Sequence, residues 1–146
     1  MAIRKSILMM TTTGTRWNLI GEPIRGNAYY GYDDGVCTVQ NIYQNFVGGF
    51  GIQASLALKP CPEDWFWISL NQQGNTTVPY ITYPIVPLAP TGANGGDTGS
   101  MAFTFIGNFV WLRAVLTREY IQPYMMPSSN FETWQYGQLD SVRVSL

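Results

Sequence analysis

The sequence predicts an all-β protein built as one β-sandwich, and three observations support this prediction. Short segments alternate between apolar and polar residues with a period of two, which is typical of half-buried strands. Clusters of glycine and proline separate these segments, as turns between strands do. No stretch carries a convincing helical period. Many short strands joined by such turns favour a sandwich or jelly roll, in which two sheets cover each other's apolar faces.

Taken in order, the chain offers a series of candidate strands separated by loops. The clearest run through residues 36–43, 50–58 and 109–118, which are rich in β-branched and aromatic side chains. Further candidates are residues 3–10, 16–20, 65–70, 101–106, 131–136 and 140–146. Residues 26–35 are predicted as a loop, with a tight turn at Asp34-Gly35.

A chain of 146 residues suits one domain. A domain of that size buries about 70% of its unfolded surface and needs no disulfide or metal to fold. Residues 16–146 are predicted to form the sandwich, and residues 1–15 an N-terminal arm or edge strand. Residues 1–10 have the charge-then-apolar order of a signal peptide, but the apolar part is too short and no small-residue cleavage site follows.

The hairpin over residues 47–71 is the segment around which the other strands are expected to pack. Along residues 50–58, five apolar side chains fall on one face: Phe50, Ile52, Ala54, Leu56 and Leu58. Residues 59–64 carry two prolines, which remove ladder donors, and β-formers resume at Trp65. The predicted core residues of the hairpin are Phe50, Ile52, Leu56 and Trp65.

The second clear strand, residues 109–118, shows the same alternation. Its predicted inward face consists of Val110, Leu112, Ala114 and Leu116. The opposite face carries Trp111, Arg113 and Thr117. We therefore add Val110 and Leu112 to the predicted core.

Residues 72–100 carry four prolines and several glycines, with Asp97 as their only charge. This stretch is too proline-rich for a helix or a central strand and too apolar for a disordered linker. We expect an extended arm that lies on its own sheet or on an adjacent subunit. Deleting residues 78–94 is therefore predicted to weaken assembly and leave the fold intact. The candidate contact residues of this arm and of the N-terminus are Ile7, Leu8, Met9, Tyr80, Ile81, Tyr83, Ile85, Val86 and Leu88.

Charged residues make up 12% of the chain, about half the usual share. Together with six methionines and 14% aromatic residues, this is the composition of a protein interface. We therefore expect a homo-oligomer, with a monomer of polar but uncharged surface as the alternative. A net charge of −1 without a basic stripe argues against nucleic acid as a partner. No apolar run reaches the length of about 18 residues that marks a membrane span.

The chain has no histidine, which removes Ser-His-Asp and Cys-His catalysis and most zinc sites. Its carboxylates include two adjacent pairs, Asp33-Asp34 and Glu63-Asp64, whereas glycosidase carboxylates converge from separate elements. The sequence Asp33-Asp34-Gly35 lacks the alternating ligands of a calcium loop, and residues 92–97 lack the lysine of a phosphate-binding loop. We therefore predict no enzymatic activity, no cofactor and no metal site.

Cys37 and Cys61 are the only cysteines in the chain. Two are too few for a disulfide scaffold, and neither belongs to a CxxC pair. They are predicted to be free or buried thiols in a reducing cytosol, with a disulfide bridge as the alternative.

Aromatic residues accompanied by Asn, Gln and Asp form a combination that is able to stack on sugars. The candidate glycan contacts are Trp17, Tyr29, Tyr30, Tyr32, Trp134 and Tyr136. The alternative, which we favour, is that these side chains fill the core or a subunit interface.

Three stretches resemble jelly-roll modules in virion proteins of tailed phages. They are residues 46–57 (FVGGFGIQASLA), 63–68 (EDWFWI) and 107–114 (GNFVWLRA). Those modules carry a strand, an acidic turn, a tryptophan and a second strand, followed later by glycine, an aromatic residue, Leu or Val, arginine and alanine. Residues 89–99 are similar to small structural proteins of marine cyanobacterial phages, and the whole resemblance covers about residues 36–121.

The resemblance implies a non-enzymatic virion structural protein that decorates the capsid or belongs to the neck, tail or baseplate. Such a protein is assembled in the host cytoplasm and contacts itself and other virion proteins. In related modules the tryptophan and arginine are structural, so the resemblance gives Trp65 the role of core anchor and Arg113 that of holding a neighbouring turn or carboxylate. The alternative function is a carbohydrate-binding module for attachment to the host surface.

Overall fold

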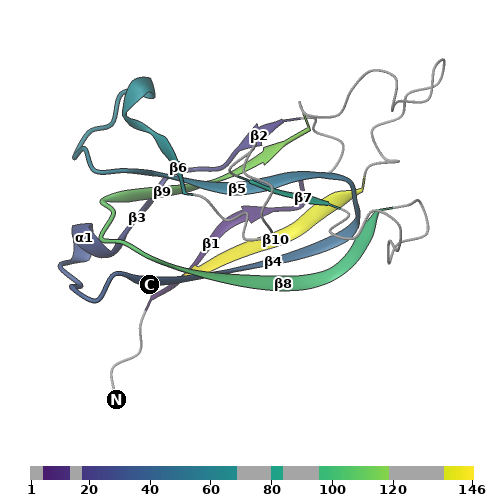
Figure 1. The fold of residues 1–146 in the computed structure, drawn as a ribbon, viewed down its shortest axis with the longest axis horizontal. Helices are drawn as coiled ribbons and strands as arrows, with labels where there is room; N and C mark the ends of the chain where they lie inside the picture. Colours follow the sequence, from purple (N-terminus) through teal and green to yellow (C-terminus); the bar gives the residue numbers. More distant parts are fainter. Residues whose placement is uncertain (1–4, 14–17, 69–79, 84–95, 119–136) are drawn as a thin grey trace.

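Two antiparallel sheets pack face to face in the computed structural model, which describes residues 5–13, 18–68, 80–83, 96–118 and 137–146 (Figure 1). This arrangement confirms the all-β sandwich predicted from the sequence. The structure also contains a four-residue α-helix, α1 (Asn27–Tyr30), and a single 3₁₀ turn, η1 (Pro62–Asp64). Both lie in segments where no strand was predicted.

The first sheet, sheet A, contains four strands in the spatial order β1, β10, β4 and β8. Their bounds are Ser6–Thr11 for β1, Gln138–Ser145 for β10, Val36–Phe46 for β4 and Asp97–Ile106 for β8. Residues 6–11 thus form an edge strand of the sandwich, one of the two possibilities predicted for the N-terminal segment. The last strand along the chain, β10, lies between β1 and β4.

The second sheet, sheet B, has two longer strands, β9 and β5, at its centre and short strands along both edges. β2 and β3 pair with one edge of β9, while β6 and β7 pair with the far edge of β5. Each pair of short strands therefore acts as one interrupted strand. The bounds are Leu19–Ile20 (β2), Ile24–Arg25 (β3), Gly48–Ser55 (β5), Phe66–Ile68 (β6), Ile81–Tyr83 (β7) and Trp111–Thr117 (β9).

The order in which the chain visits the two sheets is that of a jelly roll. When each interrupted strand is counted once, the chain runs through sheets A, B, A, B, B, A, B and A. Connections that pass repeatedly between the sheets in this way produce two Greek keys. The apolar faces of the long strands are thereby turned toward each other.

Alternation along the strands places one set of side chains in the core between the sheets. The fully buried apolar members include Val39, Phe46, Phe50, Ile52, Ala54, Leu112, Ala114, Leu116, Leu139, Val142 and Val144. Three of the predicted core residues, Phe50, Ile52 and Leu112, are in this set. The predicted core residues Trp65, Val110 and Arg113 are half-buried.

The predicted core position of Leu56 is wrong, because 63% of this residue is exposed, and Leu58 is 74% exposed. The strand β5 ends at Ser55, which lies opposite Trp111, the first residue of β9. The backbone N–H of Val110 donates a hydrogen bond of 3.0 Å to the carbonyl oxygen of Ser55 and closes this end of the ladder. The apolar alternation continues in the sequence beyond Ser55, but no strand within the described ranges continues beside it.

Candidate functional site

The predicted contact residues fall into three groups in the structure. Met9 and Tyr83 are buried in the core, so the prediction that they form an interface is wrong. Leu8 is 41% exposed, whereas Ile7, Tyr80 and Ile81 are half-buried. Ile85, Val86 and Leu88 lie outside the described residues.

The strand β7 explains why part of the predicted arm belongs to the core. Residues 81–83 pair with β5, and this pairing directs the ring of Tyr83 between the sheets, where it is 1% exposed. A deletion of residues 78–94 removes this strand and this ring. We therefore no longer expect such a deletion to leave the fold intact.

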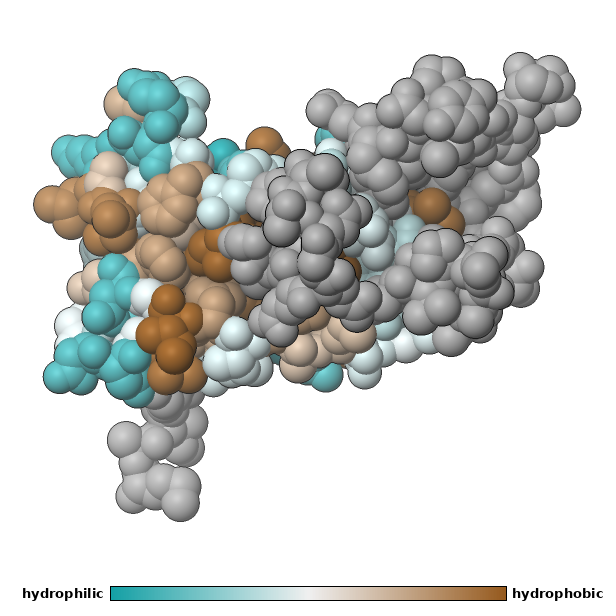
Figure 2. Space-filling view, viewed as in Figure 1, coloured by the Kyte–Doolittle hydropathy of each residue, from teal (hydrophilic) through white to brown (hydrophobic). Residues whose placement is uncertain are grey.

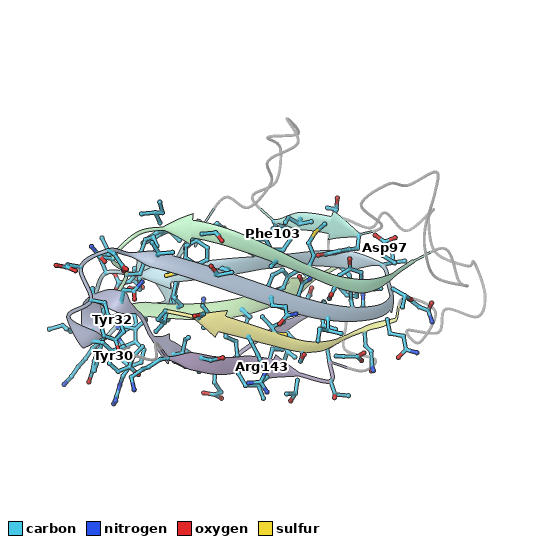
Figure 3. The ribbon with its side chains drawn as sticks, turned by 90° about the horizontal axis from the view of Figure 1, so that it is seen from below. Tyr30, Tyr32, Asp97, Phe103 and Arg143 are labelled. Atoms are coloured by element: carbon cyan, nitrogen blue, oxygen red, sulfur yellow. The ribbon has the colours of Figure 1, made fainter. Side chains whose placement is uncertain are left out.

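Of the predicted glycan contacts, Tyr30 and Tyr32 lie at one end of the sandwich (Figure 3). Their rings are stacked with centroids 5.6 Å apart, and both pack partly against the core. The Nζ of Lys5 lies 4.8 Å from the ring centroid of Tyr30. One face of the Tyr30 ring thus packs against one face of the Tyr32 ring, and the Lys5 cation lies over Tyr30. This arrangement leaves little aromatic surface for a sugar. Trp17, Trp134 and Tyr136 lie outside the described residues.

A different set of side chains crosses the outer face of sheet B in one row. Gln53 on β5 lies directly opposite Arg113 on β9 and directly opposite Trp67 on β6. Residues that face each other across antiparallel strands point to the same side of the sheet. Because Leu112 and Ile52 point into the core, these three side chains point away from it.

Two glycines form a floor beside this row. A Cβ atom on Gly51 would lie 2.6 Å from the ring of Trp67, and one on Gly49 would lie 2.5 Å from the ring of Tyr80. Both rings therefore pack directly against the backbone of β5, because the two glycines have no side chain to separate the rings from the sheet. Their centroids are 5.5 Å apart. We call Trp65, Trp67 and Tyr80 together the aromatic platform.

Arg113 is held on this platform by two contacts. Its guanidinium lies 4.1 Å from the ring centroid of Trp65, and its Nε donates a hydrogen bond of 2.8 Å to Oε1 of Gln53. Arg113 forms no ion pair, and its two Nη groups donate no hydrogen bond, to any residue that the structure describes. Partial burial of this unneutralised charge lowers the pKa of Arg113 from its ordinary value.

A second surface gathers apolar side chains at the end of the sandwich that contains α1 and the β8–β9 turn. Brown side chains are concentrated at this end, on the left of the view (Figure 2). The most exposed of them are Leu56, Leu58 and Ile106, the last with 77% of its surface accessible. Tyr29 and Phe66 are 44% and 40% exposed at the same end. We call these five residues the apolar end.

Contacts with residues at and just before the start of β9 fix the side chains of the apolar end. Phe66 packs edge-on against Phe109 with ring centroids 5.8 Å apart, and Tyr29 packs against Trp111 at 5.5 Å. The Nε1 of Trp111 donates a hydrogen bond of 3.0 Å to the carbonyl oxygen of Leu58. The exposed leucines are therefore carried by a loop that is fixed to the start of β9.

A polar group that the residue pattern did not predict lies in the core between the two sheets. Nδ2 of Asn41 donates a hydrogen bond of 2.8 Å to the hydroxyl oxygen of Tyr83, whose ring lies 4.6 Å from that of Tyr43. Burial raises the pKa of Tyr83, and burial followed by the negative charge of Asp97 raises the pKa of Tyr43. Both phenols are therefore neutral at physiological pH, and the hydrogen bond links β4 of sheet A to β7 of sheet B.

A buried arginine was also missed. Arg118 follows β9 and is fully buried, with its Nε donating to the carbonyl oxygen of Val47 at 2.8 Å and its Nη2 to that of Gly137 at 2.9 Å. It thereby ties the β4–β5 connection to the residue before β10. The sequence around position 118 predicted a strand from its alternating apolar residues, and nothing in that pattern indicated a buried arginine.

Comparisons of this chain with models of protein families, with curated proteins and with solved structures returned no match. Within the described ranges, no three Cys, Asp or Glu side chains are grouped so that they could hold a metal ion. In the same ranges, no helix has the length and apolar character that crossing a membrane requires. The aromatic platform with Arg113 and the apolar end are therefore the two surfaces that carry functional hypotheses.

Proposed function

We propose that this chain is a non-enzymatic structural protein of a tailed-phage virion, which self-associates through the apolar end. The observation that carries the proposal is the clustering of exposed apolar side chains. Of the eight large hydrophobic residues that are exposed in the described part of the chain, five lie at the apolar end. Apolar side chains exposed singly are ordinary, but a contiguous group of them marks an interaction surface.

The energetics of the apolar end suit an assembly contact. Burying one leucine or isoleucine side chain contributes about 1.5–3 kcal/mol relative to leaving it in water. Leu56, Leu58 and Ile106 together are sufficient to offset part of the several kcal/mol that association costs in lost freedom. Many identical contacts in a particle then strengthen one another through avidity.

The surroundings of the apolar end also suit a protein contact. The loop that carries Leu56 and Leu58 continues into Lys59, Glu63 and Asp64, all of which are exposed. An apolar centre with a charged rim is the usual anatomy of a protein interface. A second copy of the chain is the proposed neighbour, since a charged fraction of 12% over the whole sequence indicates that much of its surface is covered.

The proposal replaces the contact residues expected from the sequence. Met9 and Tyr83 were assigned to contact arms, and they are buried in their own sandwich. The proposed place remains the capsid surface, the neck, the tail or the baseplate of a particle assembled in the host cytoplasm. The resemblance of residues 36–121 to virion modules supports this placement, and the jelly-roll fold, which capsid proteins share with lectins, is compatible with it.

Light scattering coupled to size-exclusion chromatography tests the proposal. We expect the unmodified protein to be oligomeric at micromolar concentration and the variants Leu58→Glu and Ile106→Glu to be monomeric, because a buried carboxylate opposes association. The matched control is Ile42→Glu, which places the same charge at a residue 39% exposed on sheet A and is expected to stay oligomeric. Circular dichroism verifies that each variant is folded. A monomeric parent protein, or oligomers that persist in both end variants, would overturn the proposal.

A further inference from the structure

We propose that the outer face of sheet B binds an acidic saccharide, with Arg113 holding its carboxylate and Trp67 of the aromatic platform stacking a sugar ring. This binding site is separate from the apolar end, and the proposal does not depend on self-association. It also differs from the glycan contacts predicted from the sequence, because it uses neither Tyr30 nor Tyr32.

The first support is the state of the Arg113 guanidinium. The guanidinium lies over the ring of Trp65, 4.1 Å from its centroid, and the hydrogen bond to Gln53 occupies Nε. The two Nη groups of Arg113 are then left, and they donate to no described residue. Two parallel N–H groups in one plane match the two oxygens of a carboxylate. The arginine is thus pre-oriented for an anion that the described part of the chain does not supply.

The second support is the charge of the surrounding face. The strands of sheet B contain two charged residues, Arg25 and Arg113, and in their described ranges no carboxylate. Arg25 lies opposite Trp111, so both arginines belong to the outward-facing set. The guanidinium of Arg25 lies over the ring of Tyr29 at 4.6 Å. The described strands of this face therefore carry only positive charge, and the carboxylates nearest in sequence to the platform, Glu63 and Asp64, lie on the turn before Trp65.

The third support is the aromatic platform itself. Trp67 lies against the glycine floor with one side of its ring, which turns the other side away from the sheet. The C–H face of a pyranose packs on such a ring, whereas its hydroxyls need polar neighbours at the edge. Nε2 of Gln53, which donates to no described residue, provides one such group. Arg113 and Trp67 are two strands apart, or about 10 Å, which fits a short oligosaccharide.

Other anionic ligands fit this face less well. A nucleic-acid strand requires a series of cations along its backbone, and the described strands of this face carry two. A carboxylate from another protein would use Arg113 but would leave the aromatic platform without a role. An acidic sugar uses both features at once.

The ligand arm of the test compares charged and neutral sugars of the same shape by isothermal titration calorimetry on the full chain. The probes are trigalacturonate and sialyllactose, each paired with its methyl ester. We expect at least one acidic probe to bind, and its neutral counterpart to bind about tenfold or more weakly, as expected for the loss of one charge-assisted pair. Absence of binding by both acidic probes at 10 mM, on the order of the weakest specific affinities, would overturn the proposal.

The protein arm uses three substitutions and one control. Arg113→Lys keeps the charge but removes the fork, and Trp67→Leu removes the stacking ring. Gly51→Ala places a methyl group 2.6 Å from the original position of the Trp67 ring and lifts the ring without altering Arg113. Each is expected to weaken the acidic sugar about tenfold, while Arg143→Gln, at the exposed arginine on the outer face of sheet A (Figure 3), leaves its affinity unchanged.

The outcomes separate the proposed ligand from a protein carboxylate. Thermal unfolding verifies that each variant is folded, and Gly51→Ala provides an independent result if Arg113→Lys is not. A glutamate-containing tetrapeptide that binds as tightly as the acidic sugar, with no loss in Trp67→Leu, would show that no sugar ring is recognised and would refute the saccharide assignment. Equal affinity in Arg113→Lys would refute the role of the guanidinium fork.

Discussion

The hydroxyl oxygen of Tyr83 accepts a hydrogen bond of 2.8 Å from Nδ2 of Asn41, and this bond joins the two sheets. Asn41 belongs to β4 in sheet A and Tyr83 to β7 in sheet B. Apolar contacts between the sheets are not directional, whereas a hydrogen bond fixes the position of β7 along β4. A strand of three residues is too short to fix its own register, so this contact compensates for its length.

Substitution of Tyr83 by phenylalanine tests this joint. The variant loses the acceptor for Asn41, whose Oδ1 already has no hydrogen-bond partner among the described residues. We expect a loss of about 1–3 kcal/mol in the free energy of unfolding, measured by urea denaturation. Tyr29→Phe is the matched control and should change stability by less than about 0.5 kcal/mol, because Tyr29 is 44% exposed. A loss of the same size in both variants would contradict the inter-sheet role.

The buried phenols also predict how stability depends on pH. The pKa of Tyr83 is raised above its ordinary value of 10.0, chiefly by burial, so the folded chain keeps a proton that the unfolded chain releases in alkali. This contribution to stability is complete below about pH 10 and falls as the pH rises toward the folded-state pKa. The expected slope is up to about 1.4 kcal/mol per pH unit for each such tyrosine. Urea denaturation from pH 9 to 11 measures it, and Tyr83→Phe should show a shallower decline than the parent protein.

Arg118 is expected to be worth more to stability than any exposed arginine. Replacing it with methionine removes the donors to the carbonyl oxygens of Val47 and Gly137. Leaving these groups unpaired should reduce the free energy of unfolding by about 2–4 kcal/mol. Arg118→Lys should recover little of this loss, because an ammonium does not reproduce the planar fork. Arg143→Met serves as the exposed control, and equal effects at positions 118 and 143 would refute the proposed tie.

The two thiols should react at very different rates. Cys61 is exposed, whereas Cys37 is fully buried and its sulfur accepts a hydrogen bond of 3.1 Å from Nδ2 of Asn27. A thiol reagent such as Ellman's reagent should modify one cysteine rapidly in the native protein and the second only after unfolding. Cys61→Ser should abolish the rapid phase. The structure records both cysteines as free, so labelling of neither before reduction would contradict it.

Residue alternation predicted the centre of the fold well, because burial on one face of a strand imposes it. Phe50, Ile52 and Leu112 were expected in the core, and all three are fully buried. Leu56 continues the same alternation and is exposed, because the extent of a strand depends on its neighbour and β9 begins opposite Ser55. The length of a partner strand is a property of the folded sheet and does not appear in the local pattern.

The polar residues of the interior were beyond the reach of the local pattern for a similar reason. Asn41 and Tyr83 are 42 residues apart in the chain, and only the jelly-roll topology brings them together. Tyr83 also lies in a proline-rich stretch, which concealed the short strand that positions it. The outward direction of Arg113 followed from alternation, but its neighbours Trp65 and Gln53 depend on the pairing of three strands.

The position of β10 between β1 and β4 has a consequence for biosynthesis. A nascent chain emerging from the ribosome has made both flanking strands long before it makes the one that separates them. Until β10 is made, sheet A is incomplete, and the side chains of Met10 and Val39, which are buried in the finished fold, lack part of their cover. Folding therefore has to wait for contacts that are distant in sequence, and such contacts form slowly. Incomplete chains are the state in which this molecule is most exposed to chaperones and to wrong partners.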